Sequence, residues 1–201
     1  MSTPNLQFMA EIKREYPLIG LALTVHRSVR DTPITFKDKP YLIELYKDFP
    51  VIKGADIIKA VQTGISELMI QLILERAGWS HKICAYVLPT YSLRNRFVQK
   101  RIDPLLERVP EYQARTHGSG GNVAGKRFGK GSLLFLGSNT PSDFVEFSAD
   151  IMVIDEFDRC VPENIRMARD RLRESPNPQI FRLGNPTIPK FGVDGLYENT
   201  D

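Results

Sequence analysis

Short apolar segments alternate with helical segments after residue 50, and no other feature of the sequence constrains the fold as strongly. Five apolar segments are expected to form strands, at residues 51–60, 83–88, 133–136, 151–154 and 180–183. Helical patterns lie between them, at residues 66–77, 93–109 and 164–174, and Pro104 should start a new helix or kink the second of these. Strands that alternate with helices form parallel sheets covered on both faces. The pattern predicts an α/β fold with a mainly parallel central sheet flanked by helices.

The first 50 residues have a different character and are expected to form a small N-terminal lead-in. Four prolines divide this stretch into short segments, of which residues 36–46 read as a short helix. Residues 51–201 are expected to form the core domain. A chain of 201 residues is long enough to bury a core without disulfides or structural metals. Its formal net charge of +3 neither demands nor excludes a nucleic-acid partner.

Several classes of protein are unlike this sequence. No apolar run approaches the roughly 18 residues of a membrane span, and the N-terminus lacks the apolar stretch of a signal peptide. Cys84 and Cys160 are too few for a disulfide framework, and three scattered histidines suggest no metal cage. We therefore expect a soluble protein of a reducing cytoplasm, without a membrane partner and with both cysteines packed inside.

Residues 59–66, KAVQTGIS, look like a phosphate-binding loop whose lysine has moved. The common pattern is G-x-x-x-x-G-K-[ST]; here Gly64 and Ser66 match, Ile65 occupies the lysine position and Lys59 replaces the first glycine. Such a loop binds phosphate mainly through backbone N–H groups and the N-terminus of the following helix. A lysine on a long flexible stem could still reach the phosphates from the start of the loop. An ordinary turn capped by Ser66, with Lys59 in solvent, would explain the same residues.

Two further motifs follow apolar strands. The strand at residues 151–154 ends in Asp155 and Glu156, and a carboxylate in that position points into the ligand crevice of a parallel sheet. Asp155 would support Mg²⁺ and Glu156 would deprotonate the attacking water, although strands often end in solvated acids. The segment LGNPT follows the last strand, and its Asn185 or Thr187 could sense the terminal phosphate, although Gly-Asn-Pro also favours a plain turn. The loop at residues 59–66 and the acidic pair of Asp155 and Glu156 together favour nucleotide hydrolysis as the function.

Basic residues concentrate between residues 94 and 130, where nine stand against three acidic ones. Part of this segment, residues 116–131, is glycine-rich and should form a mobile loop or hairpin. The basic side chains could contact the phosphates of duplex DNA, or Arg115 or Arg127 could reach a neighbouring subunit's nucleotide as an arginine finger. A solvated basic helix is the alternative, and the same alternatives hold for the arginines of residues 166–173.

The sequence resembles the ATPase domain of the large terminase subunit of tailed bacteriophages. Five blocks carry the resemblance in the expected order: PYLIELYKD, KAVQTGISE as a deviant Walker A motif of the lambda type, YVLPTYSLRNRFVQKRIDPLL, MVIDEFDR as Walker B, and LGNPT as the coupling motif. They span about residues 36–187. The resemblance implies a P-loop NTPase fold of the ASCE type, with ATP and Mg²⁺ as ligands.

The resemblance also implies roles for individual residues. Ser66 and Asp155 would bind the metal, Glu156 would be catalytic, and Asn185 and Thr187 would couple hydrolysis to movement. Residues 36–41 would lie near the adenine. The residues implied to contact the nucleotide are Lys59, Gln62, Thr63, Gly64, Ile65, Ser66 and Glu67.

By the same resemblance, the chain would translocate double-stranded DNA into a procapsid in the host cytoplasm. It would act as a homo-oligomeric ring, a pentamer on a portal, together with a small terminase subunit. The nuclease that large terminases carry at their C-terminus is not expected here, because the chain ends at Asp201. The rival interpretations are a nucleotide-binding or DNA-binding module without significant hydrolysis of its own. A helicase-like ATPase would need a second RecA-like domain, for which 201 residues leave no room.

Overall fold

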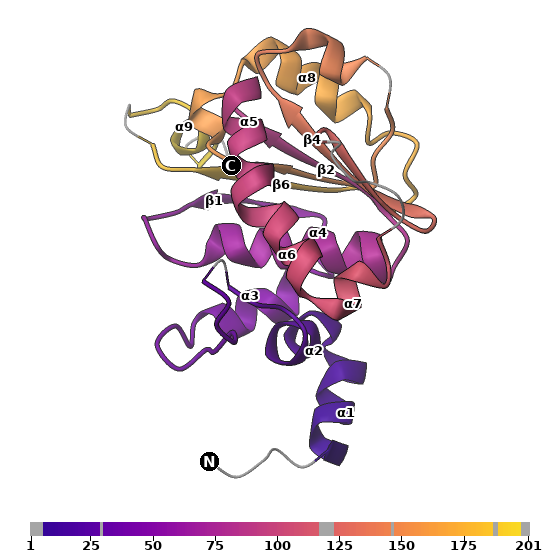
Figure 1. Cartoon of the computed structure of the whole chain (residues 1–201). Coiled ribbons are helices and arrows are strands. Elements are labelled where there is room, and N and C mark those ends of the chain that lie inside the picture. Colours follow the sequence, from indigo (N-terminus) through magenta and orange to yellow (C-terminus); the bar gives the residue numbers. More distant parts are fainter. Residues whose placement is uncertain (1–5, 29, 117–122, 146, 187–188, 198–201) are drawn as a thin grey trace.

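The computed structural model describes residues 6–28, 30–116, 123–145, 147–186 and 189–197, and a twisted sheet lies at its centre (Figure 1). In these ranges the sheet has six strands, in the order β1-β6-β5-β2-β4-β3. Neighbouring strands pair in parallel, except that β3 is antiparallel to β4. The strands are β1 (Gly54–Ile58), β2 (Ile83–Leu88), β3 (Gly125–Phe128), β4 (Gly131–Gly137), β5 (Ile151–Ile154) and β6 (Gln179–Gly184). The predicted α/β fold with a mainly parallel sheet is confirmed.

Helices cover both faces of this sheet, as expected for parallel strands. Helix α4 lies beneath the sheet with the N-terminal helices below it, whereas α8 lies on the opposite face (Figure 1). No helix in the described ranges is long and apolar enough to cross a membrane. The α-helices are α1 (Leu6–Glu15), α2 (Pro17–Thr24), α3 (Leu42–Asp48), α4 (Ile65–Gly78), α5 (Tyr91–Phe97), α6 (Asp103–Arg108), α7 (Pro110–Gln113), α8 (Pro162–Asp170) and α9 (Val193–Tyr197); three further turns are η1 (Val98–Ile102), η2 (Pro141–Phe144) and η3 (Phe157–Arg159).

Strand β2 shows how the sheet separates two hydrophobic cores. Successive side chains of a strand point to opposite faces. Accordingly, Cys84 and Tyr86 belong to the core that includes α4, whereas Ala85 and Val87 belong to the core that includes Ile165 of α8. All four side chains are almost fully buried. Burial on both faces explains why this strand reads as one continuous apolar run.

Helix α4 is apolar nearly all round, and this accounts for the position of the lead-in. A helix without a polar face must be covered on every side. The sheet covers one side of α4, and α2 packs against another. Leu18, Leu42 and Tyr46 of the lead-in are buried in the same core as Leu68 and Ile73 of α4. The lead-in therefore completes the burial of the helix that follows the loop of residues 59–64.

Several element boundaries differ from those expected. The lead-in helix is α3 at residues 42–48 rather than 36–46, and α1 and α2 were not predicted. Gly64, not Ser66, precedes the first turn of α4, and the basic helix expected at residues 164–174 is α8 and ends at Asp170. Within the glycine-rich segment, residues 125–128 form β3 and turn directly into β4, which is the hairpin alternative. Residues 117–122 lie outside the described ranges.

Candidate functional site

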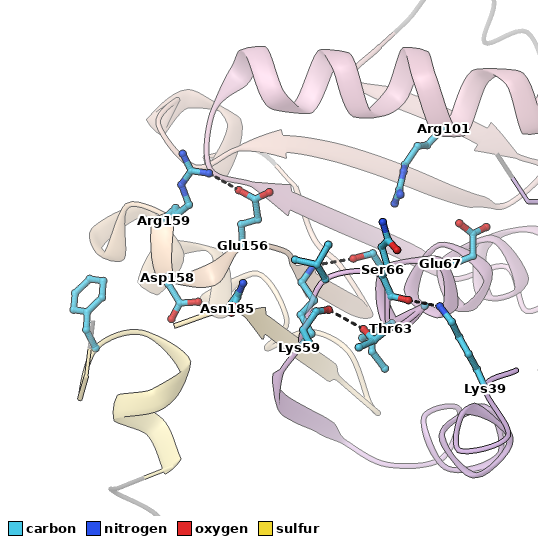
Figure 2. A pocket seen from close by; sticks show the side chains of 16 residues that line it. Lys39, Lys59, Thr63, Ser66, Glu67, Arg101, Glu156, Asp158, Arg159 and Asn185 are labelled. Carbon is cyan, nitrogen blue, oxygen red and sulfur yellow. Dashed lines mark hydrogen bonds and ion pairs between the residues drawn. The ribbon is translucent and has the colours of Figure 1, made fainter. Parts of the chain in front are cut away.

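A pocket of about 610 Å³ lies where the loops that follow β1, β5 and β6 meet (Figure 2). The carboxyl ends of parallel strands share one edge of the sheet, so residues far apart in the sequence converge there. We call this cavity the edge pocket. Of the residues predicted for the site, those that line it are Lys59, Gln62, Thr63, Gly64, Ile65, Ser66, Glu67, Glu156 and Asn185. The sequence therefore identified most of the lining of one cavity.

The loop itself is held by two side chains from the lead-in. Lys39 Nζ donates a hydrogen bond to the carbonyl oxygen of Gln62, and the Tyr41 hydroxyl donates to that of Thr63 at 2.7 Å. Gly64 has a φ of +93°, a conformation that favours glycine, and so lets the chain enter α4 directly from the loop. Both side-chain bonds use carbonyl oxygens, so they do not occupy the N–H groups of the loop.

Lys59 lies in a compact polar group with two residues of the predicted motifs. Its ammonium donates to Ser66 Oγ at 2.8 Å and forms an ion pair with Asp155. The Ser66 hydroxyl in turn donates to Asp155 Oδ2 at 3.1 Å. Only 17% of the Lys59 side chain is exposed. The alternative of a plain turn, with Ser66 as helix cap and Lys59 in solvent, is therefore wrong for this loop.

Tyr86 completes this polar group from beneath. Its hydroxyl donates to Asp155 Oδ2 at 2.7 Å, and its ring stacks on Phe97. Burial, together with the Asp155 carboxylate, raises the pKa of Tyr86 well above its ordinary value. The hydroxyl thus remains a proton donor across the physiological range. Asp155 accepts hydrogen bonds on both oxygens and is itself almost fully buried.

The oxygen atoms of Ser66 and Asp155 suit Mg²⁺. This ion prefers oxygen ligands and is usually held by one or two carboxylates together with substrate phosphates. Clusters of three or more His, Cys, Asp or Glu side chains that could hold a metal ion are absent from the described ranges. Mg²⁺ held by Ser66 and Asp155 would complete its coordination with oxygen atoms of water or phosphate. The ammonium of Lys59 now bridges the same two oxygen-bearing side chains, which marks their position as one that attracts a cation.

Glu156 lies at the rim of the edge pocket and is far more accessible than Asp155. Its backbone is left-handed, with a φ of 52°, and a non-glycine residue in that region is commonly found at functional sites. About 41% of its side chain is exposed, and Oε2 lies 3.1 Å from Arg159 Nη1 (Figure 2). The turn after β5 thus separates two adjacent acids into a buried carboxylate and an accessible one.

Strand β6 lies between the strand that leads to the loop and the strand that leads to the acidic pair. It pairs with β1 on one side and with β5 on the other. The backbone N–H of Lys59 donates to the carbonyl oxygen of Gly184 at 2.9 Å, and Asn185 follows directly and lines the edge pocket. The predicted coupling segment therefore contacts the loop through the main chain. Thr187, the other predicted coupling residue, lies outside the described ranges.

Sequence reasoning missed several residues of the edge pocket. Arg159 lies within the block MVIDEFDR and Arg101 within YVLPTYSLRNRFVQKRIDPLL, but nothing in the sequence shows that they face the cavity. Glu67 contacts a residue that was not predicted at all: its Oε1 lies 2.7 Å from Nε2 of the buried His26, which also contacts the Tyr112 hydroxyl at 2.8 Å. Lys39, which also lines the pocket, belongs to residues 36–41, the segment expected near the adenine; the lining residues that were missed are Arg101, Asp158, Arg159 and Phe191.

The basic segment is less uniform in the structure than in the sequence. Arg94 is buried and donates to the carbonyl oxygen of Phe135, and Lys126 is buried in an ion pair with Asp103. Arg115 stacks over the Trp79 ring at 4.1 Å, and Arg127 is exposed on β3. Neither of these two arginines lines the edge pocket of its own chain. Other basic residues that remain exposed here are Arg96, Lys100, Arg108 and Lys130.

Both cysteines are expected to resist thiol reagents in the folded protein. Burial raises the pKa of Cys160 to about 12 and also raises that of Cys84. Because the thiolate is the reactive form, only about one Cys160 side chain in 10⁴ would be ionised at pH 8. An aromatic disulfide reagent should therefore react slowly with the native chain and rapidly with both cysteines after denaturation. Fast reaction of either cysteine with the reagent in the native protein would contradict this assignment.

The chain matches one known protein family over most of its length. The family model described as phage terminase large subunit gpA, ATPase domain, matches residues 28–201. No curated protein sequence matches the chain.

Solved structures with a similar fold include large terminases of bacteriophages. The large terminase of bacteriophage HK97 superposes with a TM-score of 0.74 at 11% identity, over 92% of this chain and 40% of that one. A mutant of the large terminase ATPase domain of Thermus phage P74-26 gives a TM-score of 0.50 at 13% identity, over 72% of this chain and 64% of that one. At such low identity the likeness concerns the fold alone. The chain spans about 40% of the length of the HK97 protein.

Proposed function

We propose that this chain, which belongs to the phage terminase large subunit gpA family through its ATPase domain, binds ATP with Mg²⁺ in the edge pocket and hydrolyses it to drive double-stranded DNA into a procapsid. The observation that carries the proposal is the group formed by Lys59, Ser66 and Asp155. It combines a cation for phosphate with a hydroxyl and a carboxylate for a metal. Its members come from the two ends of the loop and from the first position of the acidic pair that follows β5.

Nucleotide binding would rearrange this group. The loop and the N-terminus of α4 attract phosphate, and Lys59 has a flexible stem that can turn from Asp155 to a phosphate oxygen. Ser66 and Asp155 would then hold Mg²⁺, which when bound neutralises phosphate charge. Tyr86 would keep the Asp155 carboxylate oriented through its hydrogen bond at 2.7 Å. Before the nucleotide binds, the Lys59 ammonium would thus occupy the position expected for the metal.

Glu156 would act on the attacking water. Its carboxylate is accessible at the pocket rim, where a general base must be to reach a water molecule beside the terminal phosphate. The ion pair with Arg159 holds it in the absence of nucleotide. When Glu156 takes the proton from water, the resulting hydroxide attacks the terminal phosphorus and ADP leaves. Arg159 would hold the Glu156 carboxylate when the nucleotide is absent and release it to the attacking water when ATP is bound.

Coupling to movement would use strand β6. The Gly184 carbonyl accepts the Lys59 backbone N–H, and the Asn185 side chain lies in the pocket, so a change at the terminal phosphate would reach β6 directly. Thr187 remains a predicted partner of Asn185 in this role. The chain would work as a homo-oligomeric ring, a pentamer on a portal, with a small terminase subunit. The exposed basic residues of α5, α6 and the β3–β4 hairpin would contact DNA phosphates.

A second candidate function is a nucleotide-binding or DNA-binding module that does not hydrolyse ATP. Ile65 favours it, because this residue stands where P-loop enzymes usually carry their lysine. A nucleotide-binding module would differ from the motor in turnover, whereas a DNA-binding module would bind DNA with an affinity that nucleotide does not change.

Removal of Mg²⁺ should weaken nucleotide binding through Asp155. In a titration with a non-hydrolysable ATP analogue, we expect chelation of Mg²⁺ to lower the affinity of the wild-type chain at least about tenfold, or about 1.4 kcal/mol. Asp155→Asn should bind weakly whether or not Mg²⁺ is present, because the amide is a poor ligand for this ion. Asp170→Asn, an exposed residue of α8, is the matched control and should behave like the wild type. Wild-type Mg²⁺ dependence in Asp155→Asn would remove Asp155 from the metal site, and a wild-type chain that binds no nucleotide would refute the proposed function.

A further inference from the structure

Among the residues that the structure describes, one cation of the edge pocket differs from the others in having no hydrogen-bond or ion-pair partner. Lys39 is bonded to the loop, Lys59 to Ser66 and Asp155, and Arg159 to Glu156. Arg101 also lines the pocket, yet within the described ranges its guanidinium makes neither a hydrogen bond nor an ion pair. The Arg101 guanidinium carbon lies over the face of the Phe97 ring, 5.9 Å from the ring centroid. An unpaired guanidinium in a cavity lined by phosphate-binding elements is suited to an anionic ligand.

The backbone directs Arg101 toward the pocket through an unusual helical turn. Pro104 has no N–H group and therefore cannot continue the regular hydrogen bonding of α5. Instead the Asp103 N–H bonds to the carbonyl oxygen of Val98, five residues back, and residues 98–102 form the π-helical turn η1. Such turns change the direction of side chains and are frequent at functional sites. The Arg101 side chain extends from this turn toward the loop and Ser66 (Figure 2).

The turn that carries Arg101 follows Phe97, which packs behind the group formed by Lys59, Ser66 and Asp155. Val98 and Ile102 are fully buried, so the turn is fixed to the core. Phe97 stacks on Tyr86 with ring centroids 4.7 Å apart, and the Tyr86 hydroxyl is bonded to Asp155. The charge of Arg101 also lowers the pKa of Tyr86, against the larger upward effects of burial and Asp155. Arg101 is thus electrostatically coupled to the group that would bind Mg²⁺ and phosphate.

We propose that Arg101 binds the terminal phosphate of the ATP held by its own chain. This inference rests on the proposed function and adds a phosphate-binding residue to it. A guanidinium presents two parallel N–H groups that match a phosphate. Arg101 comes from η1 and Lys59 from the start of the loop, on different sides of Ser66 (Figure 2), so the two cations would hold the phosphate between them. ADP lacks this phosphate and would leave Arg101 unpaired.

The inference differs from the role expected of Arg115 and Arg127. Those two residues were predicted as candidates to reach a neighbour's nucleotide, and neither lines the edge pocket of its own chain. Arg101 acts within one chain, so the isolated monomer should already distinguish ATP from ADP. A trans-acting arginine would give this distinction only in an assembled ring.

The test compares ADP with a non-hydrolysable ATP analogue, both with Mg²⁺, at chain concentrations that sedimentation shows to be monomeric. We expect Arg101→Ala to lower the affinity for the ATP analogue roughly 10- to 150-fold, which is the range for loss of a hydrogen bond to a charged group. The affinity for ADP should change less than about threefold. Unchanged ADP binding also shows that the variant folds. Arg101→Lys should lose part of the analogue affinity, because it keeps the charge but not the planar fork. Lys100→Ala, an exposed neighbour outside the pocket, should match the wild type.

The outcomes separate this inference from the function on which it rests. Equal losses for ADP and the analogue, or no loss for either, would overturn the role of Arg101 while leaving nucleotide binding intact. A loss that appears only at concentrations where the chain oligomerises would assign Arg101 to a neighbouring subunit's nucleotide and would also overturn the inference. A wild-type chain that binds neither nucleotide would refute the proposed function and this inference together.

Discussion

Glu156→Gln is expected to lower the rate of ATP hydrolysis about 10²- to 10⁴-fold, the usual contribution of a positioned general base. The glutamine has nearly the same shape but cannot take a proton from water. Affinity for ATP should change less than about threefold, because Glu156 lies at the pocket rim, outside the group formed by Lys59, Ser66 and Asp155. Phosphate release at saturating ATP measures the rate, and an equilibrium titration measures the affinity.

The matched control is Glu163→Gln, an exposed glutamate of α8, which should keep the wild-type rate. If Glu156→Gln hydrolyses ATP as fast as the wild type, Glu156 is not the general base. If both proteins bind ATP and neither hydrolyses it, the chain is the nucleotide-binding module of the second candidate function. A selective loss of turnover in Glu156→Gln is the result that only the motor interpretation predicts.

Lys59→Ala is expected to weaken binding of a non-hydrolysable ATP analogue roughly 10- to 150-fold, or about 1.5–3 kcal/mol. Alanine removes the ammonium that would contact phosphate, and the Ile65 side chain at the usual lysine position cannot replace it. An equilibrium titration with Mg²⁺ present measures the loss. Lys53→Ala provides a control of equal size, since Lys53 is exposed before β1, at the opposite edge of the sheet. An affinity within about threefold of the wild type would show that Lys59 is not the phosphate ligand.

The sequence predicted the fold and the main members of the site because both follow from local patterns. Buried parallel strands are continuous apolar runs, as β2 and β5 are, and each run marks its own end. Since such ends meet at one sheet edge, the positions of Ser66 and Asp155 in the sequence already predicted their proximity. The structure places their side chains 3.1 Å apart.

What could not be predicted depends on contacts between distant segments. The pairing of Lys59 with Asp155 depends on two strands that are separated by β6 in the sheet. The partner of Glu67 is His26, which lies 41 residues earlier, two residues after the end of a helix that the sequence did not reveal. Pro104 indicated a break in the helix. The direction of the chain at that break, and with it the direction of the Arg101 side chain, depends on how Val98 and Ile102 pack in the core. Charge counting likewise could not separate buried Lys126 from exposed Arg127.

The central claim is that Lys59, at the start of the loop, is the lysine that binds phosphate. Thermal unfolding of the wild type and Lys59→Ala, with and without Mg²⁺ and a non-hydrolysable ATP analogue, tests it most directly. At 100 times its Kd the analogue should stabilise the wild type by about 2.7 kcal/mol. At the same concentration Lys59→Ala should gain at most about half of that, relative to its own ligand-free state. An equal gain in both proteins, or no gain for the wild type at millimolar analogue, would contradict the claim.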